Sequence, residues 1–291
     1  MTMLVPAAAL PAVLLRLGRV SNLPTVWTNV LAAVVLSGGD WRSRHFGVLL
    51  IAMSLSYVGG MYLNDYFDRA IDARERPDRP IPSGAIPAYA VAAVGFVLLG
   101  GGFVLVAMAG VAAASVAAAL LAAAVVAYDL RHKGNPFGPA IMGACRALVY
   151  VTAAALAGSV SAFIIVAALA VAAYVAGLTY AARQESLDKV GNLWPLALVA
   201  APLLAAVGVF AVGAGAIAIY LLLALWMGAA VYLLAKRPGV GAVSRAVGWL
   251  IAGISLCDAA LLASGGAMTP ALVAIGGFVV TLVAQKYIAG T

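Results

Sequence analysis

Charged side chains are scarce in this sequence. Asp, Glu, Lys and Arg make up 9% of its 291 residues, whereas 65% of the residues are hydrophobic. An ordinary soluble domain needs a more polar surface, so this composition excludes that class and indicates a polytopic membrane protein. Cysteine is almost absent as well. The two cysteines, Cys145 and Cys257, each lie in an apolar run, which disfavours a disulfide or a zinc site.

Long apolar runs dominate the chain instead. Each is close to the length that a helix needs to cross a bilayer. The runs lie near residues 22–39, 46–64, 88–108, 112–130, 138–158, 161–182, 194–213, 215–235, 245–264 and 269–288. We therefore predict an all-α fold in which residues 1–291 form a single domain, a polytopic transmembrane helical bundle of about ten helices.

The basic residues are distributed unevenly between the two ends of this predicted bundle. There are 17 Lys and Arg against 10 Asp and Glu, which gives a formal net charge of +7. All but three basic residues lie on the side of the N-terminus and the longer loops; Arg42 and Arg44 lie opposite and Arg146 lies inside a run. The positive-inside rule then predicts that both termini and the longer loops are cytosolic. Basic residues dispersed between apolar runs do not indicate nucleic-acid binding.

Acidic residues gather in two of these cytosolic loops, which we place at 64–87 and 183–193. In the first, Asp65, Asp68 and Asp72 follow Asn64. On a helix their offsets of 0, +3 and +7 place the three carboxylates within roughly 60° of one another. Grouped carboxylates repel unless a cation lies between them, and Mg²⁺ bridges carboxylates to phosphate oxygens. The pattern therefore predicts that the chain holds a metal-bound phosphate at the edge of the membrane.

Three segments together resemble the UbiA superfamily of intramembrane prenyltransferases. They are NDYFDRAID (64–72), RERPDRPIPSG (74–84) and YDLRHK (128–133). The resemblance implies a helical bundle, typically of nine helices, with a cytosol-side polar pocket, so we expect nine to ten helices here. It also implies Mg²⁺-dependent transfer of an isoprenoid from a prenyl diphosphate to an acceptor.

The resemblance, together with the charge of the side chains, assigns roles to individual residues. Metal binding is expected at Asn64, Asp65, Asp68, Asp72, Glu185 and Asp188. Catalytic roles are expected for Asp65, Asp68, Asp72, Lys133 and Arg146. Substrate binding is expected at Asn64, Arg79, Tyr128, Arg183, Lys189 and Asn29.

The second acidic loop departs from the family pattern. Family members usually carry two or more aspartates there, often four residues apart. This chain has Glu185 and Asp188, three apart, with Gln184 near the position where an Asp is expected. Both acids still share one helical face. The pair is either a second Mg²⁺ site or an ordinary charged loop, and it leaves the substrate identity open.

Three polar residues lie inside apolar runs. Arg146 either lines the pocket or extends to the cytosolic surface, and we favour the pocket because an intramembrane charge is costly without a function. Asn29 either reaches the pocket or bonds a neighbouring helix. Asp258 is expected to be neutral or satisfied by a helix partner, and no catalytic role is predicted for it.

The sequence thus predicts an integral, multi-pass membrane prenyltransferase. Its partners would be a prenyl diphosphate, a small acceptor and membrane lipid, without nucleic acid. An aromatic acceptor such as a hydroxybenzoate is the default by family analogy; a porphyrin, a polyol or a glycerol lipid stays open, as do chain length and oligomeric state. The alternatives are an ion-coupled transporter and a catalytically inactive prenyl-lipid-binding relative.

Overall fold

The computed structural model describes residues 10–131, 135–183 and 192–290, and throughout these ranges the regular structure is helical, without strands. The predicted site residues Lys133, Glu185, Asp188 and Lys189 lie outside the described residues. The elements are α1 (Leu10–Leu17), η2 (Val20–Asn22), α2 (Leu23–Leu36), α3 (Arg44–Glu75), α4 (Ala88–Ala107), α5 (Ala112–Arg131), α6 (Gly138–Ala157), α7 (Ala162–Ala182), η4 (Trp194–Ala200), α8 (Ala201–Ala205), α9 (Val209–Val212), α10 (Ala214–Lys236), α11 (Ala242–Ser264) and α12 (Met268–Ala284).

The predicted all-α transmembrane bundle is confirmed. Within the described ranges, eight helical segments are long and apolar enough to span a membrane. Two shorter apolar helices, Val20–Leu36 and Met268–Ala284, coincide with the first and last predicted runs. Every apolar run in the sequence therefore corresponds to a helical segment. The short helix α1, which precedes these runs, was not predicted.

The seventh run is helical but broken into η4, α8 and α9. Pro195 and Pro202 lie in the first turns of η4 and α8, and Gly213 separates α9 from α10 at φ 138°. Proline has no N–H to donate, and a positive φ suits glycine, so the backbone cannot continue as one α-helix through this region.

The first acidic segment is more helical than the sequence indicated. A loop was expected from residue 64, but α3 continues to Glu75. The reason is that the segment is amphipathic: Asp65, Asp68 and Asp72 fall on a buried face, whereas Arg69 and Arg74 point outward. The acidic side chains are therefore held by a rigid helix.

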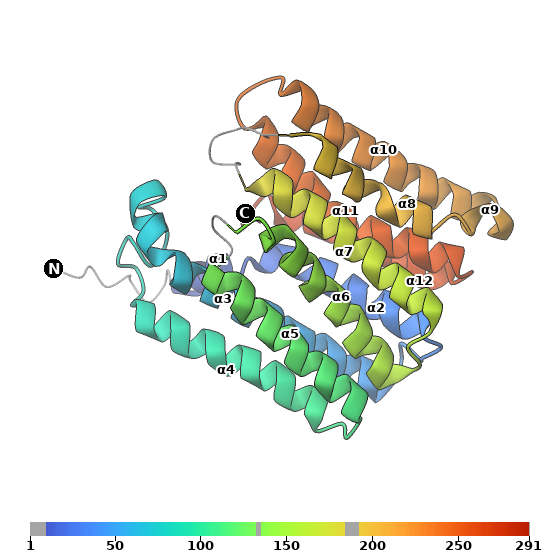
Figure 1. Cartoon of the computed structure of the whole chain (residues 1–291), viewed down its shortest axis with the longest axis horizontal. Helices are drawn as coiled ribbons and strands as arrows, with labels where there is room; N and C mark the ends of the chain where they lie inside the picture. The colour runs from blue at the N-terminus through green and yellow to red at the C-terminus, as the bar shows by residue number, and fades with distance from the viewer. Residues whose placement is uncertain (1–9, 132–134, 184–191, 291) are drawn as a thin grey trace.

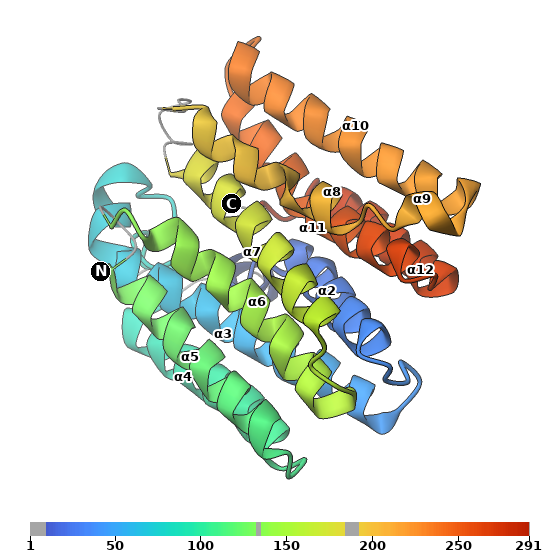
Figure 2. The same ribbon diagram turned by 45° about the vertical axis from the view of Figure 1, so that its right-hand side comes forward.

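The core of the bundle forms around α2 and α11. Helix α2 packs against α3, α6, α11 and α12, and most residues of α11 are buried. In Figures 1 and 2, α3 to α6 form one side of the molecule and α10 to α12 the other, with α2 and α7 between them. Residues distant in sequence therefore meet around α2.

Helices α3 and α4 approach each other closely through glycine. A Cβ added at Gly59 would lie 2.7 Å from the backbone nitrogen of Leu99, and one added at Gly102 would lie 2.6 Å from the carbonyl oxygen of Ala52. Small residues permit such contacts between membrane helices. This packing fixes the position of α3 and of the acidic face near its end.

Candidate active site

The acidic face of α3, which we define as Asn64, Asp65, Asp68 and Asp72, is buried. The exposed fraction of the four residues is 3–7%. Arg79, from the segment after α3, donates through one nitrogen to Asp65 at 3.2 Å and to Asp72 at 2.9 Å. Arg79, which the sequence analysis expects to bind substrate, thus contacts the carboxylates themselves in the structure.

A second arginine, Arg19, reaches the same face. Its Nη2 donates to Asp65 at 3.2 Å and to Asn64 at 3.3 Å. Burial of Arg19 opposes its charge, but the carboxylate of Asp65 favours it, and the net effect raises the pKa of Arg19. Arg19 is the residue directly before η2, and its backbone adopts a left-handed conformation with φ 41°. Sequence reasoning missed Arg19; its position at the start of the polar stretch 19–29 was the available signal.

Asn64 connects the acidic face to α5. Its amide nitrogen donates to Asp129 Oδ1 at 3.2 Å. Asp129, buried near the end of α5, was also missed as a site residue. The adjacent Tyr128 had been predicted to bind substrate, so the family-like YDLRHK segment was the signal for this position.

The chemistry of these donors suits Mg²⁺, which prefers carboxylate and amide oxygens. The geometry differs from a formed metal centre: among the described residues, no three His, Cys, Asp or Glu side chains converge on one point. Asp65 and Asp72 are instead bound by guanidinium groups. Binding of a cation would therefore require these carboxylates to exchange arginine contacts for metal contacts.

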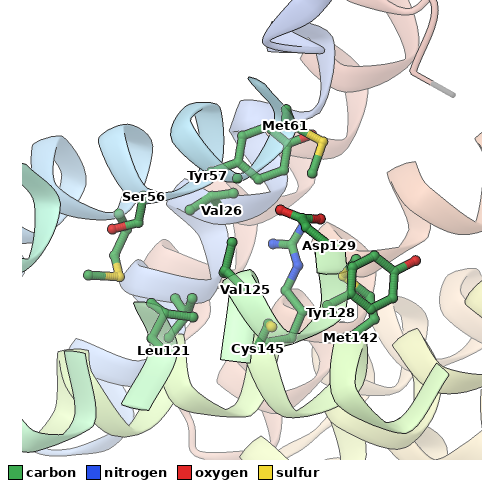
Figure 3. Close-up of a pocket in the computed structure, with 14 residues that line it drawn as sticks. Val26, Ser56, Tyr57, Met61, Leu121, Val125, Tyr128, Asp129, Met142 and Cys145 are labelled. Carbon is green, nitrogen blue, oxygen red and sulfur yellow. The ribbon is translucent and has the colours of Figure 1, made fainter. Parts of the chain in front are cut away.

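A cavity lies beside the acidic face, enclosed by α2, α3, α5 and α6. It holds about 590 Å³ of empty space, including its open mouth. Its apolar wall includes Val26, Met53, Leu121, Val125, Met142 and Val149. Figure 3 shows Leu121 and Ser56 toward one end and Met61, Tyr128 and Asp129 toward the other. The cavity is thus apolar with a polar end next to Asn64.

Arg146 lines this cavity, the location favoured from the sequence. Its Nη1 donates to Asn29 Oδ1 at 2.8 Å, and its Nη2 donates to Thr25 Oγ1 at 3.1 Å. The guanidinium also lies 5.9 Å from the centre of the Tyr57 ring. Arg146 therefore enters the cavity wall while hydrogen bonds to α2 hold it.

Asn29 continues this contact away from the cavity. Its amide nitrogen donates to both carboxylate oxygens of Asp258, at 2.9 and 2.8 Å. Tyr150 also donates its hydroxyl to Asp258. Asn29 thus makes interhelical hydrogen bonds, which was one of its two expected roles. It does not itself line the cavity but contacts Arg146, which does. Asp258 has the helix partners that the sequence analysis anticipated.

Two further predicted residues are placed by the structure. Tyr128 lines the cavity, and Arg183 lies at the C-terminal end of α7. The described part of the site therefore brings together the acidic face, Arg79, Tyr128 and Arg146, with Asn29 behind Arg146.

Comparison with known proteins agrees with this architecture. A family model described as the UbiA prenyltransferase family matches residues 22–243. A solved structure from work on digeranylgeranylglyceryl phosphate synthase in membranes superposes with a TM-score of 0.63 at 19% identity, covering 89% of this chain and 99% of the other. A UbiA homologue from Aeropyrum pernix K1 gives a TM-score of 0.65 at 20% identity, covering 82% and 96%.

Two relatives match shorter stretches at higher identity, and both are named digeranylgeranylglyceryl phosphate synthase. The protein from Methanothrix thermoacetophila is 46% identical over 72 residues, which is 24% of this chain and 27% of the relative. The protein from Methanoregula boonei is 49% identical over 57 residues, which is 19% of this chain and 20% of the relative. The chain thus spans about a quarter or less of the length of the curated relatives it matches.

Proposed function

The chain belongs to the UbiA prenyltransferase family, and from that premise we propose that it transfers an isoprenoid chain from a prenyl diphosphate to a small acceptor within the membrane. The protein is a multi-pass integral membrane protein. The observation that carries the proposal is the buried acidic face of α3, bound by Arg19 and Arg79 and adjacent to an apolar cavity.

The acidic face is proposed to bind the diphosphate head of the donor. Asn64, Asp65, Asp68 and Asp72 would hold Mg²⁺, which neutralises charge on the leaving diphosphate when bound. Arg19 and Arg79 already lie at this face and can bind phosphate oxygens with the nitrogens that now contact carboxylates. The arginines therefore keep the buried carboxylates compensated before the donor arrives.

The cavity is proposed to hold the isoprenoid chain of the donor. Its wall is largely apolar, and its polar end lies next to Asn64 through Asp129. A chain lying along the apolar part would place its diphosphate end toward the acidic face. The apolar wall would also exclude water from the allylic cation that forms when the diphosphate leaves.

For the acceptor, the names of the relatives favour a glyceryl phosphate lipid over the aromatic default of the sequence analysis. We therefore propose a glyceryl phosphate ether as the first acceptor and a hydroxybenzoate as the second. In either case the bond between the allylic carbon and the diphosphate oxygen breaks and diphosphate leaves. An acceptor oxygen or ring carbon then bonds to the allylic cation and loses its proton, which is released with the diphosphate. The termini and the acidic face are proposed to be cytosolic, on the charge distribution described above.

The test uses purified protein with labelled geranyl, farnesyl and geranylgeranyl diphosphates, with both acceptor classes and with Mg²⁺ or a chelator. We expect product and diphosphate release that require Mg²⁺ and are lost in Asp68→Asn. Asp78→Asn, an exposed acid in the segment after α3, is the matched control and should keep full activity.

Two results would overturn the proposal. Tight donor binding without release, across all acceptors, would indicate an inactive prenyl-lipid-binding relative. Metal-dependent ion flux in proteoliposomes, without donor binding, would indicate a transporter; such proteins usually bind their ions near the middle of the bilayer.

A further inference from the structure

A buried polar chain connects the cavity to the opposite side of the bundle. It consists of Arg146 on α6, Asn29 on α2 and Asp258 on α11, with Tyr150 as a second donor to Asp258. Asn29, Tyr150 and Asp258 are each 0% exposed. Ionisable groups inside spanning helices are costly and usually serve a function. These four polar residues are not part of the acidic face of α3, so their burial needs an explanation of its own.

Asp258 determines which way the Asn29 amide points. An amide presents an oxygen that accepts and a nitrogen that donates, and a carboxyl group offers acceptor oxygens to that nitrogen. Both oxygens of Asp258 are contacted by the Asn29 nitrogen, at 2.9 and 2.8 Å. The amide oxygen must therefore face the other way, where it accepts from Arg146 at 2.8 Å. Asp258 thus acts on Arg146 through Asn29.

Arg146 is held by neutral oxygen atoms. Its hydrogen bonds go to an amide and to the hydroxyl of Thr25, and they engage only part of the five N–H donors of a guanidinium. Within the described residues, the ion pairs at 4.0 Å or less are those of Arg19 and Arg79 with the acidic face of α3. Asp129, which also lines the cavity, accepts from Asn64. Among the described residues, the guanidinium of Arg146 is therefore oriented by neutral partners and forms no ion pair at 4.0 Å or less.

We propose that Arg146 binds an anionic group of the acceptor, a phosphate or a carboxylate, and that Asp258 is the residue that positions Arg146 through Asn29. This inference rests on the proposed function and names the class of acceptor for the same site. The donor diphosphate and the acceptor anion then have separate basic groups: Arg19 and Arg79 at the acidic face, and Arg146 in the cavity wall. Acceptors without a negative charge would be poor substrates.

The experiment compares acceptors that differ only in the anion. One pair is a prenylated glyceryl phosphate and the same glycerol ether without phosphate; the other is a hydroxybenzoate and the corresponding hydroxybenzyl alcohol. Wild-type protein, Arg146→Gln, Asp258→Asn and their double variant are assayed for acceptor KM, donor KM and kcat. Ser255→Ala is the control, because Ser255 joins the same helices α2 and α11 through Thr28 at 3.1 Å without contacting Arg146.

We expect the wild type to prefer one anionic acceptor by at least about tenfold, and the pair that shows the preference identifies the anion. Arg146→Gln and Asp258→Asn should each raise the KM of that acceptor by about tenfold or more, with donor KM unchanged. Because Asp258 acts through Arg146, the double variant should be no worse than Arg146→Gln, whereas independent effects would multiply. Ser255→Ala should leave the preference intact.

Three results would overturn the inference. These are an equal preference of the wild type for charged and neutral acceptors, a rise in donor KM instead of acceptor KM, and a loss in Ser255→Ala as large as in Asp258→Asn. Equilibrium binding of the same acceptor pairs in detergent provides a readout that needs no turnover. If no acceptor yields product, the proposed function fails, but the binding preference and its loss in Arg146→Gln still decide the role of Arg146.

Discussion

The bundle contains two buried polar networks that hold their arginines in different ways. At the acidic face of α3, Arg79 contacts two carboxylates directly, at 3.2 and 2.9 Å. In the cavity wall, Arg146 contacts the amide of Asn29 and the hydroxyl of Thr25. The carboxylate of Asp258 contacts Asn29 and so reaches Arg146 only through that amide. A directly paired arginine must exchange its partner when a ligand binds. An arginine oriented through an amide can receive an anion without that exchange.

Asp65→Asn should break the first network with the largest effect. Asp65 Oδ1 accepts from both Arg19 and Arg79, so the variant removes the shared partner of the two arginines and one proposed metal ligand. We expect kcat to fall by about 1,000-fold, as for the loss of a group that stabilises developing charge. The measurement is product formation at saturating donor, acceptor and Mg²⁺.

We expect Asp258→Asn to behave differently from Asp65→Asn, because Asp258→Asn should change the KM of the acceptor, whereas Asp65→Asn should change the chemistry of the donor. The two variants should therefore have distinct kinetic signatures at similar thermal stability. If Asp65→Asn retained wild-type kcat, the acidic face of α3 would not be the donor site.

The shared carboxylate face of the first network could be predicted from the sequence, because Asp65, Asp68 and Asp72 are close in the chain. Arg79 is 14 residues from Asp65 and 7 from Asp72. Helical spacing alone therefore places the carboxylates on one face. Arg19 was not predicted because it lies 46 residues from Asp65 in the sequence. Its backbone also adopts a left-handed conformation, which helical spacing does not describe.

The second network could not be predicted as a network. Arg146 is separated from Asn29 by 117 residues, and Asn29 from Asp258 by 229. The sequence marked Arg146, Asn29 and Asp258 one by one, as polar residues in apolar runs, but only the packing of α6 and α11 around α2 brings them together. Hydropathy locates helices well and says little about which helices are neighbours.

Arg79→Lys should weaken the first network without abolishing it. One guanidinium nitrogen contacts Asp65 and Asp72, and the ammonium of lysine lacks the planar fork that binds phosphate with two nitrogens. We expect donor KM to rise by about tenfold with acceptor KM unchanged. Arg69→Lys, at an exposed position on α3, is the matched control in the kinetic assay. A rise in acceptor KM would mean that the two networks share one ligand.

Gly60→Ala tests whether the cavity between the two networks holds the isoprenoid chain. A Cβ at Gly60 would lie 2.9 Å from Cγ1 of Val125, a side chain that can shift toward the cavity. We expect kcat/KM for the longest accepted donor to fall by about fivefold relative to the shortest, the equivalent of about 1 kcal/mol of overpacking. Gly100→Ala is the control, since a Cβ there meets nothing within 4 Å. Equal losses for all donor lengths would place the chain elsewhere.

Tyr150→Phe should give the smallest effect and define what orients Arg146. The variant removes one donor to Asp258 but leaves both contacts from Asn29, at 2.9 and 2.8 Å, so the amide should keep its direction. We expect acceptor KM to rise by no more than about threefold, because a single interhelical hydrogen bond in a membrane protein contributes about 0.6 kcal/mol. Donor KM should not change. A loss as large as in Asp258→Asn would show that the tyrosine hydroxyl, rather than Asn29, fixes the carboxylate, and the path from Asp258 to the cavity would then run through α6 alone.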